Sequence, residues 1–588
     1  MRNLLLFTIG PVQSFISQAR KTQDLYAGSK LLSVLIGEAI KFVGEENMIF
    51  PKYGKAMPNR FLAEVPSNEN DLAQFGEKLE EKVRHEWKII ANNLISGMKK
   101  IPIGYHNQVD AFLEIYWSIE PVSENSTYKE IIEKLEDNIA SLKNIRAFNQ
   151  FTWEKDIIGE KGRKCSLDGQ RNVLFYRPNN QNNFNIAASP LYSSHEAVYV
   201  DNRFPNNVIL KPGEGLSAIS FIKRGYKNNV TFESTADIAL LDVLHNLSSL
   251  ENETNLKYCI KTVRNTNAHL FYEENCDPKV AKNLIAETNT DKPLDEILDC
   301  SKKVREAAKK RGLKLSKYYA ILTFDGDNMG KWLSGDYLEN ESLLEDFQRN
   351  FAECLSNFAN NSEKYLDNEM GRTVYAGGDD FLGFVNLNSL LTVIEDLRKL
   401  FNELVNLPLK KFKNKYGETI SFSAGICVAH YKEPLSIVLQ QARLAQKIAK
   451  SKIKDKDSFS ISVIKGSGES HTMVLPFGIN AINVKYFRSI CVSLIQEDYS
   501  NKFISSIRRE FDKLLDTSDT IVNLGDFENI FMTELGRLLK RSAAKEPKLS
   551  LDNMKSYLGE LVGDRPLQDF FQMLAIVDFF QRELSLEL

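Results

Sequence analysis

The stretch that decides the fold is VYAGGDDFLGFVN, residues 374–386, in which two glycines and two aspartates separate two apolar runs. The runs alternate as β-strands do, and a short glycine-containing segment between them predicts a hairpin. Gly377 and Gly378 permit positive φ and let the backbone come close to a phosphate. Aspartates often occur in turns for purely local reasons. A hairpin does not need two adjacent carboxylates, however, so Asp379 and Asp380 point to a further role.

The sequence around this hairpin predicts one β-α-β-β-α-β unit followed by an extra helix and a final strand. Apolar alternation marks the strands, and apolar residues three and four apart mark the helices. This order is typical of the ferredoxin-like fold, in which an antiparallel sheet carries both helices on one face. The predicted strands lie at 318–324, 373–385, 419–429 and 458–464, and the predicted helices at 329–367, 388–406 and 435–451.

The first 120 residues repeat the same order of elements without repeating the sequence. A strand is followed by a long helix, two short strands, a second helix and an alternating apolar-polar segment. The chain therefore contains two diverged copies of one unit. The predicted strands of the first copy lie at 4–9, 48–51, 60–65 and 111–119, and its helices at 11–42 and 71–95.

The 588 residues exceed what one hydrophobic core supports, and length alone favours three or four domains. We expect an α+β chain in which a mostly helical segment connects the two ferredoxin-like units and a helical bundle follows them. The predicted domains are the first unit at 1–125, the connecting domain at 126–316, the second unit at 317–470 and the C-terminal helical domain at 471–588.

Composition excludes several classes of protein. No apolar run approaches the roughly 18 residues that would span a bilayer, and the N-terminal apolar stretch lacks a cleavage site, so no membrane contact is expected. The seven cysteines are scattered and form no disulfide framework, which suits a reducing cytoplasm. A net charge of −3 leaves nucleic-acid binding to local patches or partner subunits.

A second group of carboxylates is predicted to meet the GGDD turn. In this fold the first strand runs antiparallel to the third, and the first strand of the second unit ends in FDGDNMGKW. Asp325 and Asp327 therefore come to the edge that carries Asp379 and Asp380. Carboxylates so close together repel one another unless a cation neutralises them. Oxygen ligands select Mg²⁺ or Mn²⁺, and two such ions support in-line nucleotidyl transfer.

Several other residues are candidates for nucleotide binding, each with an ordinary structural alternative. An ammonium on the helix ARLAQKIAKSK would reach a triphosphate, although a lysine on a helix is more often only solvated. The N–H groups after Gly10-Pro11 would hold phosphate, although a capped helix with a packing glycine explains that segment equally well. The candidates are Gly377, Gly378, Asp327, Ser423, Lys447 and Lys450 in the second unit and Gly10, Gln13, Ser14, Gly28 and Ser29 in the first.

The pairing of FDGDNMGKW with YAGGDDF, together with IGPVQSFISQARKTQDLYAGSKLLS and PNRFLAEVP, resembles the large subunit of type III CRISPR effector complexes of the Cmr (III-B) kind. The likeness covers nearly the whole chain, including the family's order of first palm, linker domain, second palm with GGDD and C-terminal helical domain. Nucleotide and diguanylate cyclases share a palm but lack the N-terminal segment. Among the motif positions, Asp325, Asp379 and Asp380 match the family's metal-binding residues, with Gly326 beside them.

The resemblance implies an enzyme that works inside a complex of Cmr-type subunits with guide RNA and is switched on by target RNA. Its substrate is ATP and its product is a second messenger, usually cyclic oligoadenylate. One nucleotide lies at the second palm and the other at the first. Some compact relatives instead join ATP to S-adenosylmethionine, and no short motif here decides between the two. A catalytically silent scaffold and a stand-alone cyclase are the weaker alternatives.

Two departures from the family pattern limit what is expected. The first predicted palm begins at residue 4 and no histidine is followed by aspartate, so no HD-type nuclease activity is expected. In GRKCSLDGQRN, Asp168 occupies the place of the second cysteine of the family's zinc knuckle. A structural zinc needs about four ligands. Cys165 is therefore expected to be a buried free thiol, and a zinc shared with Cys259, His269 and Cys276 is the minor alternative.

Overall fold

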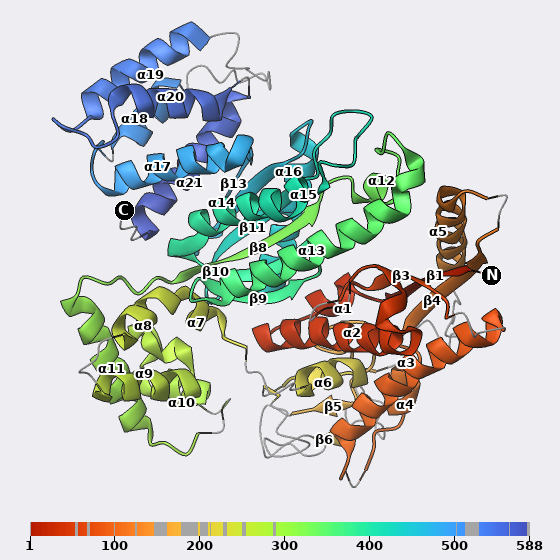
Figure 1. Cartoon of the computed structure of the whole chain (residues 1–588). Coiled ribbons are helices and arrows are strands. Elements are labelled where there is room, and N and C mark those ends of the chain that lie inside the picture. Colours follow the sequence, from red (N-terminus) through yellow and green to blue (C-terminus); the bar gives the residue numbers. More distant parts are fainter. Residues whose placement is uncertain are drawn as a thin grey trace, which may run out of the picture.

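The structure is a computed structural model, shown in Figure 1. It contains two large β-sheets with helices on their faces, a smaller linker domain with a short three-stranded sheet, and a C-terminal group of helices. Within the described residues, no helix is both long and apolar enough to cross a membrane. The structure describes residues 2–584 except for 53, 55–56, 67–70, 99, 124–125, 146–161, 178–197, 200–209, 212, 227–231, 250–253, 286–287, 289, 501, 512–527 and 564.

The first palm is built on a four-stranded antiparallel sheet in the order β2-β3-β1-β4. β1 lies between β3 and β4, as the β-α-β-β-α-β order requires, and helices α2 and α3 pack together against it. The predicted order of elements is confirmed. The elements are β1 (Asn3–Gly10), α1 (Gln13–Ser17), α2 (Thr22–Val43), β2 (Met48–Phe50), β3 (Arg60–Glu64), α3 (Leu72–Ile95), α4 (Tyr105–Asp110) and β4 (Glu114–Pro121).

Helix α5 (Tyr128–Asn144) covers the other face of the same sheet. Leu4 and Leu6 of β1 point to this face and form a separate apolar cluster with Leu135 and its neighbours on α5. The Thr127 hydroxyl caps the helix by accepting a hydrogen bond from the Glu130 backbone N–H, and the Glu130 carboxylate accepts one from the Thr127 backbone N–H. The predicted boundary at residue 126 therefore assigns to the linker a helix that packs on the first palm.

The second palm has a six-stranded sheet in the order β13-β12-β11-β8-β10-β9. Alternate residues of β8 serve two cores: Leu322 and Phe324 meet α13 and α14, whereas Tyr319 and Ile321 face α16 and the first palm. β11 and β12 are parallel because α16 connects them as a crossover. The elements are β8 (Tyr318–Gly326), α12 (Met329–Leu333), α13 (Leu344–Asp367), β9 (Gly371–Ala376), β10 (Asp380–Asn386), α14 (Leu390–Phe401), α15 (Leu407–Leu409), β11 (Phe422–His430), α16 (Leu435–Lys452), β12 (Ser458–Ile464) and β13 (Ser470–Pro476).

The remaining elements confirm a mostly helical linker and a helical C-terminus. Strand β13, which was not predicted, extends the second palm's sheet beyond residue 470, and α21 packs on it. The linker elements are β5 (Phe175–Tyr176), β6 (Val198–Tyr199), β7 (Gly215–Leu216), α6 (Ala218–Gly225), α7 (Thr235–Ala239), α8 (Leu241–Ser248), α9 (Thr254–Thr266), α10 (Pro278–Ile285) and α11 (Leu294–Lys310). The C-terminal helices are α17 (Ile482–Ile495), α18 (Lys502–Phe511), α19 (Glu528–Ser542), α20 (Leu551–Val562) and α21 (Leu567–Glu583).

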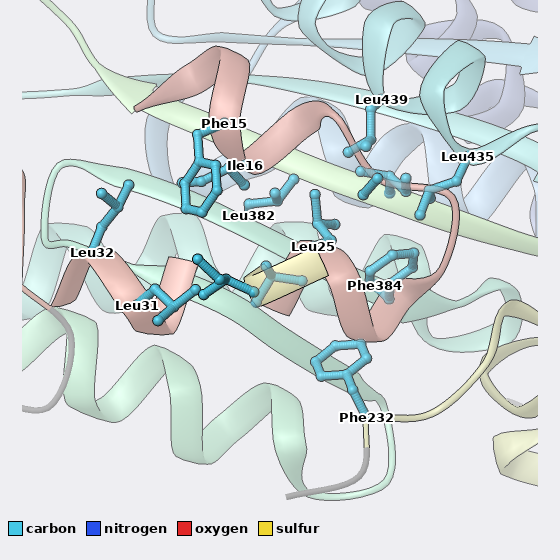
Figure 2. Packing of buried hydrophobic residues seen from close by; sticks show 14 of the residues in the cluster. Phe15, Ile16, Leu25, Leu31, Leu32, Phe232, Leu382, Phe384, Leu435 and Leu439 are labelled. Carbon is cyan, nitrogen blue, oxygen red and sulfur yellow. The ribbon is translucent and has the colours of Figure 1, made fainter. Parts of the chain in front are cut away.

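One apolar core joins the first palm, the linker and the inner face of the second palm's sheet. Figure 2 shows where the two palms meet: Leu382 and Phe384 of β10 and Leu435 and Leu439 of α16 gather with side chains of α1 and α2, among them Ile16. Every one of these residues is buried. We call this region the palm seam. It fixes the ends of β1 and β8 relative to each other.

A buried ionic cluster fastens the linker to the first palm. Arg224 of α6 pairs with Asp24 of α2 and with Glu214, and all three side chains are almost fully buried. The neighbouring Lys223 donates to the Phe15 and Gln18 carbonyls, each at 2.5 Å. Burial lowers the pKa of Lys223 to about 8. These bonds satisfy the C-terminal carbonyls of α1 and hold that short helix in place.

The packing of α5 gives a stability prediction. Leu135 is fully buried between α5 and the sheet, so Leu135→Ala removes apolar contacts and leaves a cavity that costs about 2–5 kcal/mol. We expect the melting temperature of the full chain to fall by several degrees. Leu142→Ala, on the exposed side of the same helix, is the control and should leave it nearly unchanged. Equal melting temperatures for both variants would show that α5 does not pack as described.

Candidate active site between the two palms

The register between β8 and β10 places Asp325 directly opposite Asp380. The GGDD turn is closed by two backbone hydrogen bonds: the Gly326 N–H donates to the Asp379 carbonyl at 2.9 Å, and the Gly377 N–H donates to the Asp380 carbonyl at 2.9 Å. The end of the first strand and the turn between the second and third strands thus meet at one edge of the sheet, as the fold predicts.

The two glycines of the turn are needed for different structural reasons. Gly378 has a φ of +105°, which an L side chain rarely adopts. Gly377 does not have positive φ, which corrects the expectation from sequence. A Cβ at Gly377 would lie 1.8 Å from the Tyr375 hydroxyl, so glycine leaves room for that side chain. The turn therefore places the hydroxyl of Tyr375 beside the carboxylates.

The carboxylates destabilise one another's charged forms. Burial within the cleft and the charge of Asp325 raise the pKa of Asp379 to about 6. Burial and the charges of Asp379 and Asp325 raise the pKa of Asp380 to about 7, although its side chain opens toward cavities. The ammonium of Lys450 forms an ion pair with Asp325 and donates to the Gly326 carbonyl at 3.0 Å. A cation already lies next to this group of negative charges.

Two cavities adjoin the GGDD turn. The first, of about 790 Å³, lies between α1 and α2 of the first palm and α16 of the second. The second, of about 740 Å³, lies between the first palm's sheet, α5 and the end of β8. Only the second is lined by Asp325 and Asp379. Both are lined by Asn59, Tyr375 and Asp380, so these three residues form the wall common to the two cavities.

The structure brings together about half of the predicted nucleotide-binding residues. Gln13, Ser29 and Lys447 line the first cavity, and Lys450 reaches Asp325. Ser14 is exposed and lines neither cavity, and Ser17, one turn further on, lines the first cavity in its place. Some of the N-terminal candidates therefore line the first cavity, and the others do not.

Asp327 and Ser423 were predicted to bind nucleotide, but they bind each other. The Ser423 hydroxyl donates to the Asp327 carboxylate at 2.9 Å, and the Ser421 hydroxyl and the Asp457 N–H donate to the same group at 2.8 and 3.1 Å. Asp327 is 3% exposed, and burial raises its pKa. Because it is buried and already accepts hydrogen bonds from three donors, its role in this structure is to brace the loop that follows β8.

The N-terminal segment also differs from its prediction. The expected helix over 11–42 is divided into α1 and α2, and α1 is only five residues long. Gly28 and Ser29 do not interrupt α2; Gly28 is buried, and a Cβ there would lie 3.0 Å from the Lys223 Cδ and 3.4 Å from the Ile16 Cα. Gly10 lies beside Glu114 and lines neither cavity. Both glycines serve packing.

The degenerate zinc knuckle is closed by hydrogen bonds. The Asp168 carboxylate accepts from the Gln170 and Arg171 N–H groups at 2.9 and 3.0 Å and from the Ser217 hydroxyl at 2.7 Å. Cys165 is a buried free thiol beside Ser220, as expected.

No three or more His, Cys, Asp or Glu side chains in the described ranges stand close enough together to hold a metal ion. The minor alternative, a zinc held by Cys165 with Cys259, His269 and Cys276, is therefore not formed. Asp325, Asp379 and Asp380 are likewise not gathered into a finished ligand set, and Lys450 is the cation that Asp325 contacts.

Three residues of this site were missed in the sequence. Asn59 ends the turn between β2 and β3, at the position in the first palm that corresponds to the GGDD turn, and comparing the two copies would have found it. Tyr375 lies within the quoted stretch and was treated as a strand residue. Arg443 lies four residues before Lys447, so both occupy one side of the helix. Their i, i+4 spacing was the available signal.

The fold and the site define a class: two palms face one another, and the one with a nucleotidyltransferase-like fold carries three carboxylates at its sheet edge. Residues 318–460 match the family model of the Cas10/Cmr2 second palm domain, and residues 4–92 match that of the CRISPR-associated protein Cmr2 N-terminal region. The resemblance to the large subunit of type III-B CRISPR effector complexes is confirmed.

Individual relatives agree with the family models. The chain is 25% identical to CRISPR system Cmr subunit Cmr2 of Pyrococcus furiosus over 625 aligned positions, which cover 87% of this chain and 67% of the relative. It matches the fold of a chain in the cryo-EM structure of type III-B Cmr-β in the apo state, with a TM-score of 0.65, 14% identity and coverage of 99% and 82% of the two chains. The Cmr-β structure bound to cognate target RNA matches equally well, with a TM-score of 0.65.

The raised carboxyl pKa values give a pH prediction. Asp379 and Asp380 hold their protons in the folded chain up to about pH 6 and 7, whereas in the unfolded chain they lose them near pH 4. Their contribution to stability is therefore complete below pH 4 and is lost as the pH rises to 7. In EDTA, Asp379→Asn/Asp380→Asn should melt progressively higher than the wild-type chain as the pH increases from 5 to 8. The same difference at both pH values would contradict the proposed charge repulsion.

Proposed function

We propose that this chain is a metal-dependent nucleotidyltransferase that uses ATP to make a second messenger, cyclic oligoadenylate, within a type III-B complex. The observation that carries the proposal is the wall common to both cavities. A transfer between two bound molecules needs two adjoining sites that open on the reacting group. Here both cavities open on Asp380, and one of them also contains Asp325 and Asp379.

We assign the donor ATP to the second cavity, because all three carboxylates line it. Asp325, Asp379 and Asp380 would hold Mg²⁺ or Mn²⁺, since hard cations prefer oxygen ligands and would relieve the repulsion that raises the pKa values of Asp379 and Asp380. When bound, such ions stabilise the attacking and leaving oxygens of an in-line displacement. Lys450, released from Asp325, is then positioned to neutralise the triphosphate.

We assign the molecule that supplies the hydroxyl to the first cavity, where Gln13, Ser29 and Lys447 lie. In the reaction, the 3′-hydroxyl oxygen forms a bond to the α-phosphorus of the donor, the bond from that phosphorus to pyrophosphate breaks, and the hydroxyl proton passes to solvent water. The attack takes place across the common wall. Tyr375 lies in this wall with its hydroxyl protonated, because burial and the charge of Asp380 raise its pKa well above 10.

The partners follow from the relatives. The Cmr-β structure that this chain matches is bound to cognate target RNA, and the Pyrococcus furiosus relative is a subunit of the Cmr system. We therefore propose that this chain works with other Cmr-type subunits and guide RNA, and that target RNA switches it on. With a net charge of −3, the chain itself has no general excess of positive charge for RNA.

The decisive experiment uses the reconstituted complex with guide and target RNA. Radiolabelled ATP is supplied with Mg²⁺ or Mn²⁺, with and without S-adenosylmethionine, and the products are separated by chromatography. We expect the wild-type complex to make an oligoadenylate and Asp379→Ala/Asp380→Ala to make none, because the donor-side carboxylates are gone. If product forms only in the presence of S-adenosylmethionine, the acceptor is S-adenosylmethionine and not a second ATP. If the wild-type complex makes no product under any condition, the proposed activity is wrong and the chain is a catalytically silent scaffold.

The common wall gives a finer prediction. Tyr375→Phe removes only a hydroxyl that faces the reacting groups, so we expect kcat to fall about ten-fold while KM for ATP changes less than two-fold. Tyr365→Phe is the matched control, because its hydroxyl binds Asp396 and lines neither cavity. Wild-type kinetics for Tyr375→Phe would exclude this residue from the reaction.

A further inference from the structure

Arg443 is a charged side chain for which the described residues of the folded chain supply no hydrogen-bond or ion-pair partner. It lies on α16 and lines the first cavity. Its guanidinium is partly buried, and burial lowers its pKa, while the charge of Asp380 acts in the opposite direction. Within the part of the chain that the structure describes, Arg443 makes no hydrogen bond and no ion pair.

Two other arginines, Arg398, which is buried, and Arg565, which is partly buried, have hydrogen-bond acceptors within the chain. Arg398 binds both oxygens of the Asp457 carboxylate at 2.7 and 2.8 Å. Arg565, whose pKa is also lowered by burial, donates to the Val474 carbonyl at 3.0 Å. The Arg443 guanidinium is only partly buried, but no group of the described residues accepts a hydrogen bond from its five N–H donors, so they are available to an acceptor from outside the chain. The cavity that they face is the place from which one can come.

The lining of the first cavity defines the chemistry of that acceptor. Its wall contains both apolar side chains, such as Ile16 and Leu32, and polar ones. Among the described residues its cations are Arg443 and Lys447, which lie one helical turn apart, and Asp380 is its only carboxylate. A planar guanidinium with an ammonium beside it, in a cavity that also has apolar side chains, suits an anionic group on a molecule that also has an apolar or aromatic part.

We propose that Arg443 binds the anionic group of the molecule that occupies the first cavity. This inference rests on the proposed function in one respect only, the assignment of the acceptor to that cavity. The anion has two possible sources: the triphosphate of a second ATP, or the carboxylate of an amino-acid-bearing nucleoside such as S-adenosylmethionine. Either would take hydrogen bonds from Arg443 and bring its ribose toward Tyr375 and Asp380.

The test measures binding separately from catalysis. The complex with target RNA is titrated by calorimetry in Mg²⁺ with a non-hydrolysable ATP analogue and, separately, with S-adenosylmethionine. Arg443→Gln should weaken binding of the acceptor at least ten-fold, while the donor ATP still binds, so the ATP analogue would occupy one site per chain instead of two. If S-adenosylmethionine is the acceptor, its binding weakens and titration of the ATP analogue is unchanged.

Two further variants control for folding and for charge. Arg443→Lys retains a cation and should recover part of the affinity, whereas a general packing defect would not be rescued in this way. Arg537→Gln removes an exposed arginine of α19 that pairs with Glu534 and lines neither cavity, so it should bind both ligands as the wild type does.

In kinetic assays, Arg443→Gln should raise KM for the acceptor at least ten-fold and change kcat much less. Binding to Arg443→Gln that equals binding to the wild type for both ligands, including no binding to either protein, would overturn the proposal. Absence of product from a wild type that binds ligand would instead count against the proposed function alone.

Discussion

The pairing of β8 with β10 is the constraint on which the rest of the site depends. Hydrogen bonding between these strands sets Asp380 opposite Asp325 at the end of the sheet. Neither carboxylate can move away without breaking the register that the buried faces of both strands enforce. The backbone thus holds like charges together, and the surroundings must supply compensation. Lys450 supplies part of it, and Asp379 and Asp380 supply the remainder through their raised pKa values.

The apolar pattern of the sequence was enough to predict the architecture. Alternating runs and helical periodicity gave two β-α-β-β-α-β units in the correct order, because those periods report directly which faces are buried. The prediction for the end of β8 succeeded for the same reason, since strand order in this fold fixes which ends adjoin. The pattern did not show the break between α1 and α2, because apolar residues continue through it. Nor did it assign α5 to the first palm, because the periodicity of an amphipathic helix does not show which sheet its apolar face packs against.

The site was predictable only in part, and the failures have one physical cause. Asp325 lies at the end of β8 and lines the second cavity, whereas Asp327 follows the strand, where the chain turns and the hydroxyls of Ser421 and Ser423 bind it. Arg443 and Asn59 come from different domains and meet only because the palms pack together. Sequence proximity placed Asp327 and Ser423 beside the carboxylates but could not show that they bind each other, and contacts that depend on tertiary packing were not visible. The carboxylates at the strand ends were found, as were Gln13, Ser29 and Lys447 at the interface, whereas Asn59, Tyr375 and Arg443 were missed.

The palm seam has a mechanical consequence. One continuous core contains Ile16 of α1, Leu382 of β10 and Leu435 of α16. A hinge motion that separated the two palms would therefore expose this core to water. Substrates must therefore enter along the cleft from its open ends. Any signal that arrives from elsewhere must act through small displacements of side chains and loops at the rim. Movement of the Lys450 ammonium from Asp325 to a bound triphosphate would be a displacement of that size.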